Sequence, residues 1–179
     1  MVINKKKIFV FTALLCIYLF GVYFLIKTTY DPDPIRYDSL PSEGIIFSTP
    51  GYPKFIEKTS GLSRVEKWGR WTNQNYGPCI FTFKNPLPQK FILELTAVAF
   101  GPNNNAPTKI KIGGIESSVL INKPTPTNYI LELTNPSSLN TVEIIPPFPT
   151  SPFEVDPKNK DGRKLGIGLY TLKIVPIEK

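Results

Sequence analysis

Residues 91–100 read FILELTAVAF and carry the strongest secondary-structure signal of the chain. The run is apolar on both alternating faces for much of its length, which is typical of a strand covered on both sides. An apolar run alone would also be compatible with a helix, but the β-branched and aromatic residues and the preceding Pro88 favour a strand. The stretch therefore indicates a β-rich domain with a buried central strand.

The next segment gives the clearest local pairing signal. Residues 108–112 and 115–121 are two β-type runs joined by Gly113 and Gly114. A two-residue hairpin turn of this kind favours glycine because both turn positions need a positive φ. The sequence therefore predicts a β-hairpin here.

Further short β-type runs lie on both sides of this centre and are separated by Pro, Asn and Gly turns. They cover residues 44–48, 55–58, 64–68, 79–84, 129–133, 141–145 and 169–175. After residue 30 there is no long helical period, no βαβ alternation and no internal repeat, which argues against nucleotide-binding sheets and solenoids. The predicted fold is all-β, a jelly-roll-like antiparallel β-sandwich of about eight or nine strands over residues 44–179.

Residues 8–26 (IFVFTALLCIYLFGVYFLI) are uncharged and long enough to span a bilayer as a helix. Three lysines precede the run and only Lys27 follows closely, so the positive-inside rule keeps residues 1–7 in the cytoplasm. A cleaved signal peptide is the alternative, but the run is long and no small-residue cleavage site follows it. We expect an uncleaved transmembrane signal anchor, a stalk over residues 27–43 and a domain exported across the membrane.

Composition excludes several classes of function. The net charge of +7 suggests nucleic acid or anionic lipid, but four of the lysines flank the apolar run and leave only +3 on the rest. We therefore expect the membrane, through residues 8–26, and no nucleic acid as a partner. The chain has no histidine, which removes the common nucleophile–base pairs, and its two cysteines cannot build a thiolate zinc site. We expect a buried, inert Cys79, no cofactor and no metal, since no acidic loop has calcium-ligand spacing.

Residues 61–72 (GLSRVEKWGRWT) hold both tryptophans of the chain. In a strand, Trp68 and Arg70 would share one face and Trp71 would lie on the other. An exposed Trp offers a flat surface to a sugar ring, and Glu66 and Arg70 could bond its hydroxyls. The alternative is structural, with at least one Trp in the core and the arginine paired with the glutamate.

Two other segments could hold binding residues. Residues 156–169 (DPKNKDGRKLGIGL) place Asp161 and Arg163 in a loop before the last strand. Gly166 and Gly168 leave one face of that strand without side chains, so a ligand or, more simply, one of the tryptophans could pack there. Asn103 lies in an amide-rich loop that could bind hydroxyls or could merely form a turn.

These segments resemble a known domain. The stretches GLSRVEKWGRWT, NPLPQKFILELTAVAFGPNNNAP, VEIIPPFPTSP and DGRKLGIGL are similar, in this order, to a C-terminal β-domain of unassigned function. That domain is found on bacterial phosphoglycerol transferases acting on periplasmic glucans and on membrane glycosyltransferase-type proteins. The resemblance implies a β-sandwich on the periplasmic side of a bacterial inner membrane, linked to envelope glycans. Its motif positions are Glu66, Trp68, Gly69, Arg70, Trp71, Asn103, Asp161, Arg163, Gly166 and Gly168.

The large metal-dependent catalytic domain of those transferases has no counterpart in this sequence, so transferase activity does not carry over. We expect a non-enzymatic module that binds an envelope glycan or assists a glycan-modifying membrane enzyme. The candidate ligand-binding residues are Glu66, Trp68, Arg70, Trp71, Asn103, Asp161 and Arg163. The alternatives are a protein–protein interaction module without a sugar ligand and, less favoured, a glycan-active enzyme using Glu66, Glu154 or Asp161.

Overall fold

The computed structural model describes residue 18 and residues 35–177 of the chain. The chain divides into two units, residues 1–32 and 33–179, and the second contains the β-rich domain. The predicted membrane span over residues 8–26 lies, apart from residue 18, outside the described residues. No helix among the described residues is long and apolar enough to cross a membrane.

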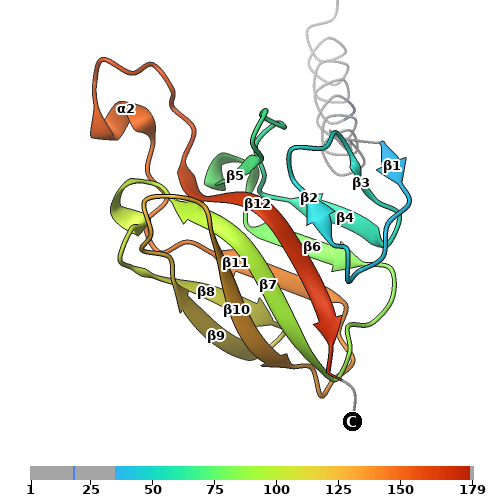
Figure 1. The fold of residues 1–179 in the computed structure, drawn as a ribbon. Coiled ribbons are helices and arrows are strands. Elements are labelled where there is room, and N and C mark those ends of the chain that lie inside the picture. The colour runs from blue at the N-terminus through green and yellow to red at the C-terminus, as the bar shows by residue number, and fades with distance from the viewer. Residues whose placement is uncertain (1–17, 19–34, 178–179) are drawn as a thin grey trace, which may run out of the picture. The chain divides into compact units, whose positions relative to one another are not determined.

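The domain is built from two antiparallel sheets (Figure 1). The first sheet has the order β10-β7-β12-β2, and β5 also pairs with β12. Its strands are β2 (Ile45–Ile46), β5 (Arg70–Asn73), β7 (Lys90–Ala99), β10 (Thr127–Thr134) and β12 (Leu165–Pro176). The second sheet has the order β4-β6-β11-β8-β9. Its strands are β4 (Ile56–Ser60), β6 (Cys79–Phe83), β8 (Pro107–Ile112), β9 (Ile115–Leu120) and β11 (Thr141–Ile145).

Smaller elements complete the domain. Strands β1 (Arg36–Tyr37) and β3 (Tyr52–Pro53) form a parallel pair, so two residues of the predicted stalk lie in a strand. The short helices are η1 (Gln74–Tyr76), η2 (Gly101–Asn103) and α2 (Pro152–Val155). From β4 to β8, consecutive strands alternate between the two sheets, and they do so again from β9 to β12.

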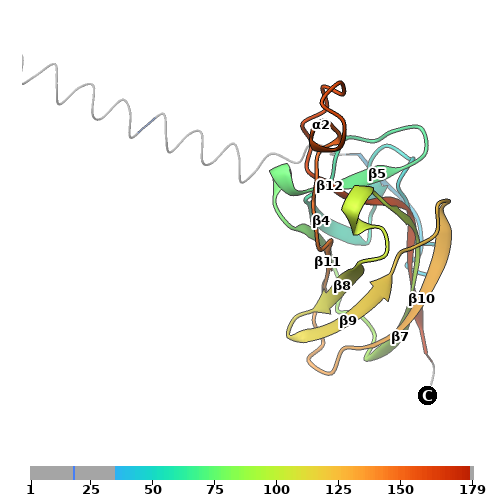
Figure 2. The same cartoon turned by 90° about the vertical axis from the view of Figure 1, so that its left-hand side faces the viewer.

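Packing between the sheets makes the hydrophobic core, and Figure 2 shows the two layers from the side. Alternate residues of β7 (Phe91, Leu93, Leu95 and Ala97) are fully buried against the second sheet. The intervening residues of β7 are only half-buried, so the expectation that both faces are covered was wrong. β7 is an inner strand of the first sheet, between β10 and β12.

The predicted strands are largely confirmed. Within residues 35–177, nine strands have four residues or more, and the all-β prediction is correct. The predicted strand over residues 64–68 is absent, since these residues form a turn and the strand begins at Arg70. The buried Cys79 is also confirmed, and burial raises the pKa of its thiol far above the usual range.

The hairpin prediction is confirmed with one difference. Strands β8 and β9 pair from Ile112 opposite Ile115, which leaves Gly113 and Gly114 as the turn. Only Gly113 has a positive φ, of 58°. A positive φ at the first turn position alone is the type II′ pattern, for which one glycine is enough.

Candidate functional site

Trp68 lies in a tight turn beside the first sheet. The amide of Glu66 donates to the carbonyl of Gly69 (2.8 Å) and the amide of Gly69 donates back to Glu66 (3.3 Å). This reciprocal pair closes the turn and replaces the strand expected there. The sequence interpretation had assumed that Trp68 and Arg70 share one face of a strand. Trp68 is not in a strand, so the two side chains do not share a face.

The two tryptophans pack together on the outer face of the first sheet. Their ring centroids are 5.0 Å apart in an edge-to-face arrangement, and Trp68 also packs on Tyr170 at 4.9 Å. Neither Trp belongs to the hydrophobic core, and both remain partly exposed. Rings held this way offer a rigid apolar surface at little further entropic cost.

Gly168 makes room for these rings. A Cβ on Gly168 would lie 2.9 Å from Trp71, closer than real Cβ contacts, and 3.0 Å from Trp68, which is also tight. The interpretation that the tryptophans pack over the glycines is therefore confirmed for Gly168. It is not confirmed for Gly166, whose close neighbours are Pro146 and Thr72.

Tyr170 was missed from the sequence. Strand β12 pairs Leu169 with Ala97 and Thr171 with Thr96, so Tyr170 is the extra residue of a β-bulge. Bulges re-aim side chains and are frequent beside functional sites. Its position two residues after Gly168 was a usable signal, but the bulge itself leaves no mark in a single sequence.

Arg163 joins two carboxylates from distant parts of the chain. Its Nη1 donates to Glu66 (2.9 Å), while its Nε (3.0 Å) and Nη2 (2.7 Å) donate to Asp161. The indole nitrogen of Trp68 donates to the other oxygen of Glu66 at 3.0 Å. The hydrogen bond from Trp68 to Glu66 therefore connects the charged side chains directly to the aromatic ones.

The Arg163 contacts fix the charge state of the group. Hydrogen bonding to Arg163 lowers the pKa of Asp161 below its ordinary value. The same contact, reinforced by Glu66, raises the pKa of the Arg163 guanidinium. Asp161 and Arg163 are therefore both ionised across the neutral range.

We name this region the Trp/Arg surface, consisting of Glu66, Trp68, Trp71, Asp161, Arg163 and Tyr170. The side chains of Glu66, Asp161 and Arg163 are 32%, 27% and 36% exposed. The group thus forms a rigid surface that solvent reaches. The structure brings together five of the seven candidate residues in this place.

Arg70 is not part of this surface. It is 4% exposed, and its guanidinium lies over the ring of Tyr52 at 4.8 Å. Residues Arg70 and Trp71 alternate along β5, so Trp71 points outward and Arg70 points to the opposite side. This places Arg70 beneath the sheet surface, in a cation–π contact.

Asn103 is also separate and is fully buried. Its amide nitrogen donates to the carbonyls of Phe100 and Phe148, and its amide oxygen accepts from the Phe148 amide, all at 2.9 Å. The side chain ties the loop after β7 to the proline-rich segment after β11. We leave it out of the candidate site because it has no surface to offer a ligand.

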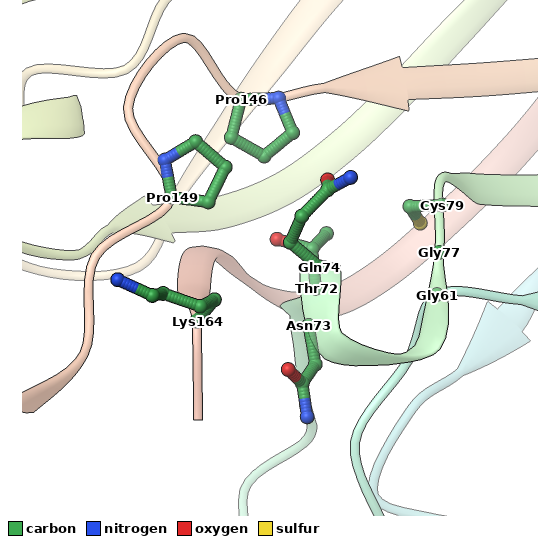
Figure 3. Close-up of a pocket in the computed structure, with 9 residues that line it drawn as sticks. All are labelled: Gly61, Thr72, Asn73, Gln74, Gly77, Cys79, Pro146, Pro149 and Lys164. Atoms are coloured by element: carbon green, nitrogen blue, oxygen red, sulfur yellow. The ribbon is translucent and has the colours of Figure 1, made fainter. Parts of the chain in front are cut away.

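A small recess lies nearby but is too small for a sugar. It is lined by nine residues, among them Thr72, Gln74, Pro146 and Lys164 (Figure 3). Its cavity volume is about 10 Å³, which is room for one water molecule at most. In the part of the chain that the structure describes, no cluster of three acidic or cysteine side chains could hold a metal.

Known proteins match the chain over a range that includes the segments of the Trp/Arg surface. The family described as "Domain of unknown function (DUF7024)" matches residues 29–176. The chain belongs to this family. Phosphoglycerol transferase I from Salmonella typhi, from Salmonella newport and from Salmonella typhimurium is in each case 39% identical over 145 residues.

That alignment covers 80% of this chain and 18% of each relative, so the chain spans less than a fifth of the proteins it resembles. The domain is thus one that occurs on phosphoglycerol transferases, which confirms the resemblance seen in the motifs. No solved structure matches the chain.

Proposed function

We propose that this chain is a membrane-anchored, non-enzymatic β-sandwich of jelly-roll type that binds an envelope glycan or assists a glycan-modifying enzyme. The Trp/Arg surface is the observation that carries the proposal. It combines partly exposed indole and phenol rings with charged groups that are fixed in place, and these are the two kinds of contact that a sugar needs. The bulge at Tyr170 supports a binding role rather than mere packing.

The envelope setting rests on two other observations. The relatives are named phosphoglycerol transferases, which supports a context of glycan modification for the family. Residues 8–26 have the composition of a membrane span, and the preceding lysines favour an N-terminus in the cytoplasm. We therefore assign the domain to the periplasmic side of a bacterial inner membrane.

A second candidate function is docking to a protein partner. Phe148, Phe153 and Val155, around α2, are 56%, 52% and 58% exposed. Exposed apolar side chains grouped in one short segment are typical of interaction surfaces. Recovery of a single stoichiometric partner from membranes, lost in Phe153→Ser, would favour this function over sugar binding.

The pairing of the carboxylates supports a non-enzymatic role. Glu66 and Asp161 both bond Arg163, and Glu154 bonds Lys164 and the Ser151 amide. These contacts lower the pKa of Asp161, and that of Glu154 to about 2. Neither of these two carboxyls would hold a proton at neutral pH, as a glycosidase acid must.

Calorimetric titration of the full chain in detergent micelles with glucose oligosaccharides tests the proposal. We expect saturable binding by the wild type, a loss of at least about tenfold in Trp68→Ala, and no change in Lys54→Ala, which lies outside the Trp/Arg surface. Absence of binding to every envelope glycan tried, with folded protein verified by circular dichroism, would refute it.

A further inference from the structure

Most of the donors of Arg163 are already engaged. Each of its three guanidinium nitrogens donates to a carboxylate, either of Glu66 or of Asp161. A guanidinium has five N–H donors and recognises a phosphate best by a two-pronged contact. The three contacts to carboxylates leave one N–H on each of Nη1 and Nη2 for a further acceptor.

The local charge also disfavours an anion. Two carboxylates face one guanidinium, which leaves a formal charge of −1 on the group. Lys67 lies in the same turn but is exposed, so its charge is screened by solvent. Lys164 is bonded to Glu154 and does not compensate the group.

Glu66 keeps free hydrogen-bond acceptor positions on this surface. A carboxylate has about four acceptor positions, and Glu66 uses one from Trp68 and one from Arg163. The oxygens of Glu66 can therefore accept from hydroxyl groups that reach them from solvent, whereas both oxygens of Asp161 already accept from Arg163. The adjoining rings of Trp68 and Tyr170 supply the apolar surface for the C–H side of a sugar ring.

Resting on the proposed function, we infer that the Trp/Arg surface binds an uncharged glycan segment and discriminates against one that carries phosphoglycerol. The ligand donates hydroxyl protons to Glu66 and stacks on Trp68. An added phosphodiester brings a negative charge to a group that already carries a formal charge of −1. The domain would then hold unmodified stretches of glycan.

Two matched probes test this inference. The full chain in detergent micelles is titrated with a glucose oligosaccharide and with the same oligosaccharide carrying phosphoglycerol groups. We expect the neutral probe to bind about tenfold more tightly in low salt, from one unit of like-charge repulsion near a partly exposed site. The difference should narrow at high salt because exposed charges are screened.

The variant Asp161→Asn removes one negative charge and frees part of Arg163. We expect it to bring the affinity of the phosphoglycerol-bearing probe to within about twofold of that of the neutral one. Equal or tighter binding of the charged probe by the wild type would overturn this inference and leave the proposed function standing. Binding of neither probe would overturn the proposed function, and this inference with it.

Discussion

At the scale of single residues, the side chain of Asn103 joins two loops. All of its hydrogen-bonding partners are backbone groups, and it is completely buried. Removing it takes away the acceptor of the Phe148 amide and one of the two donors that each of the Phe100 and Phe148 carbonyls has. We expect Asn103→Ala to lower the free energy of unfolding by about 2–3 kcal/mol.

Chemical denaturation measures this change, with the exposed neighbour in Asn104→Ala as a control. The control should differ from the wild type by less than about 0.5 kcal/mol. If the two variants are equally stable, Asn103 does not have the structural role that its contacts assign to it.

Asp161 makes a pH-dependent contribution. Because Arg163 lowers its folded-state pKa below the ordinary value near 3.8, the contribution is present above that value and is lost as pH falls through the folded pKa. Asp161→Asn should therefore be about 1 kcal/mol less stable than the wild type between pH 5 and pH 8. Below about pH 4 the difference should shrink.

Denaturation curves recorded across this pH range measure the difference. The variant Asp38→Asn serves as the control, since the Asp38 side chain is 87% exposed beside Lys54. It should show a difference under about 0.5 kcal/mol throughout. A gap for Asp161→Asn that widens on acidification would have the wrong sign for this account.

Contacts between residues far apart in the sequence were the feature that the sequence predicted least well. Glu66 and Arg163 are 97 positions apart, and no local pattern shows that they meet. They were singled out because they lie beside tryptophans and glycines, not because a contact was predicted. The opposite sides taken by Arg70 and Trp71 were predicted from strand alternation, whereas the position of Trp68 depended on a turn that was read as a strand.

Strand β12 is the element that shapes the candidate site. Gly168 leaves a space that the two indole rings fill, and the bulge turns Tyr170 toward the same rings. The atoms that a new Cβ would meet are the far ends of side chains, so the rings must shift while the strand remains. We expect Gly168→Ala to cost about 1–2 kcal/mol of stability and to change the tryptophan fluorescence.

Gly114→Ala is the matched control because nothing lies within 4 Å of its added methyl group. Its fluorescence spectrum should coincide with that of the wild type. Unchanged emission in Gly168→Ala would mean that the rings do not rest on β12 as described.

Element prediction succeeded where a pattern is local and strong. The central strand, the Gly-Gly hairpin and the strand over residues 141–145 follow from composition and turn residues alone. The two-residue strands β1 and β3 carry no such signal, since a pair of residues has no periodicity, whereas β2 lies within the predicted run over residues 44–48. Their pairing depends on the partners that the tertiary fold brings to them.

At the scale of the whole molecule, the family and the fold agree with the sequence. An all-β domain with two packed sheets was predicted from the spacing of the runs, and the family match covers residues 29–176. The distribution of the +7 charge and the missing histidine narrow the function class by composition alone.

The central claim is that a glycan binds at the Trp/Arg surface. The chain has two tryptophans, so its ¹H–¹⁵N spectrum contains two indole N–H signals, one of them from the Trp68 group that donates to Glu66. Titration of the labelled full chain in micelles with a neutral glucose oligosaccharide tests the claim directly. The account predicts a saturable shift of the Trp68 indole signal, assigned by its absence in Trp68→Phe. An unmoved indole signal at saturating oligosaccharide would contradict it.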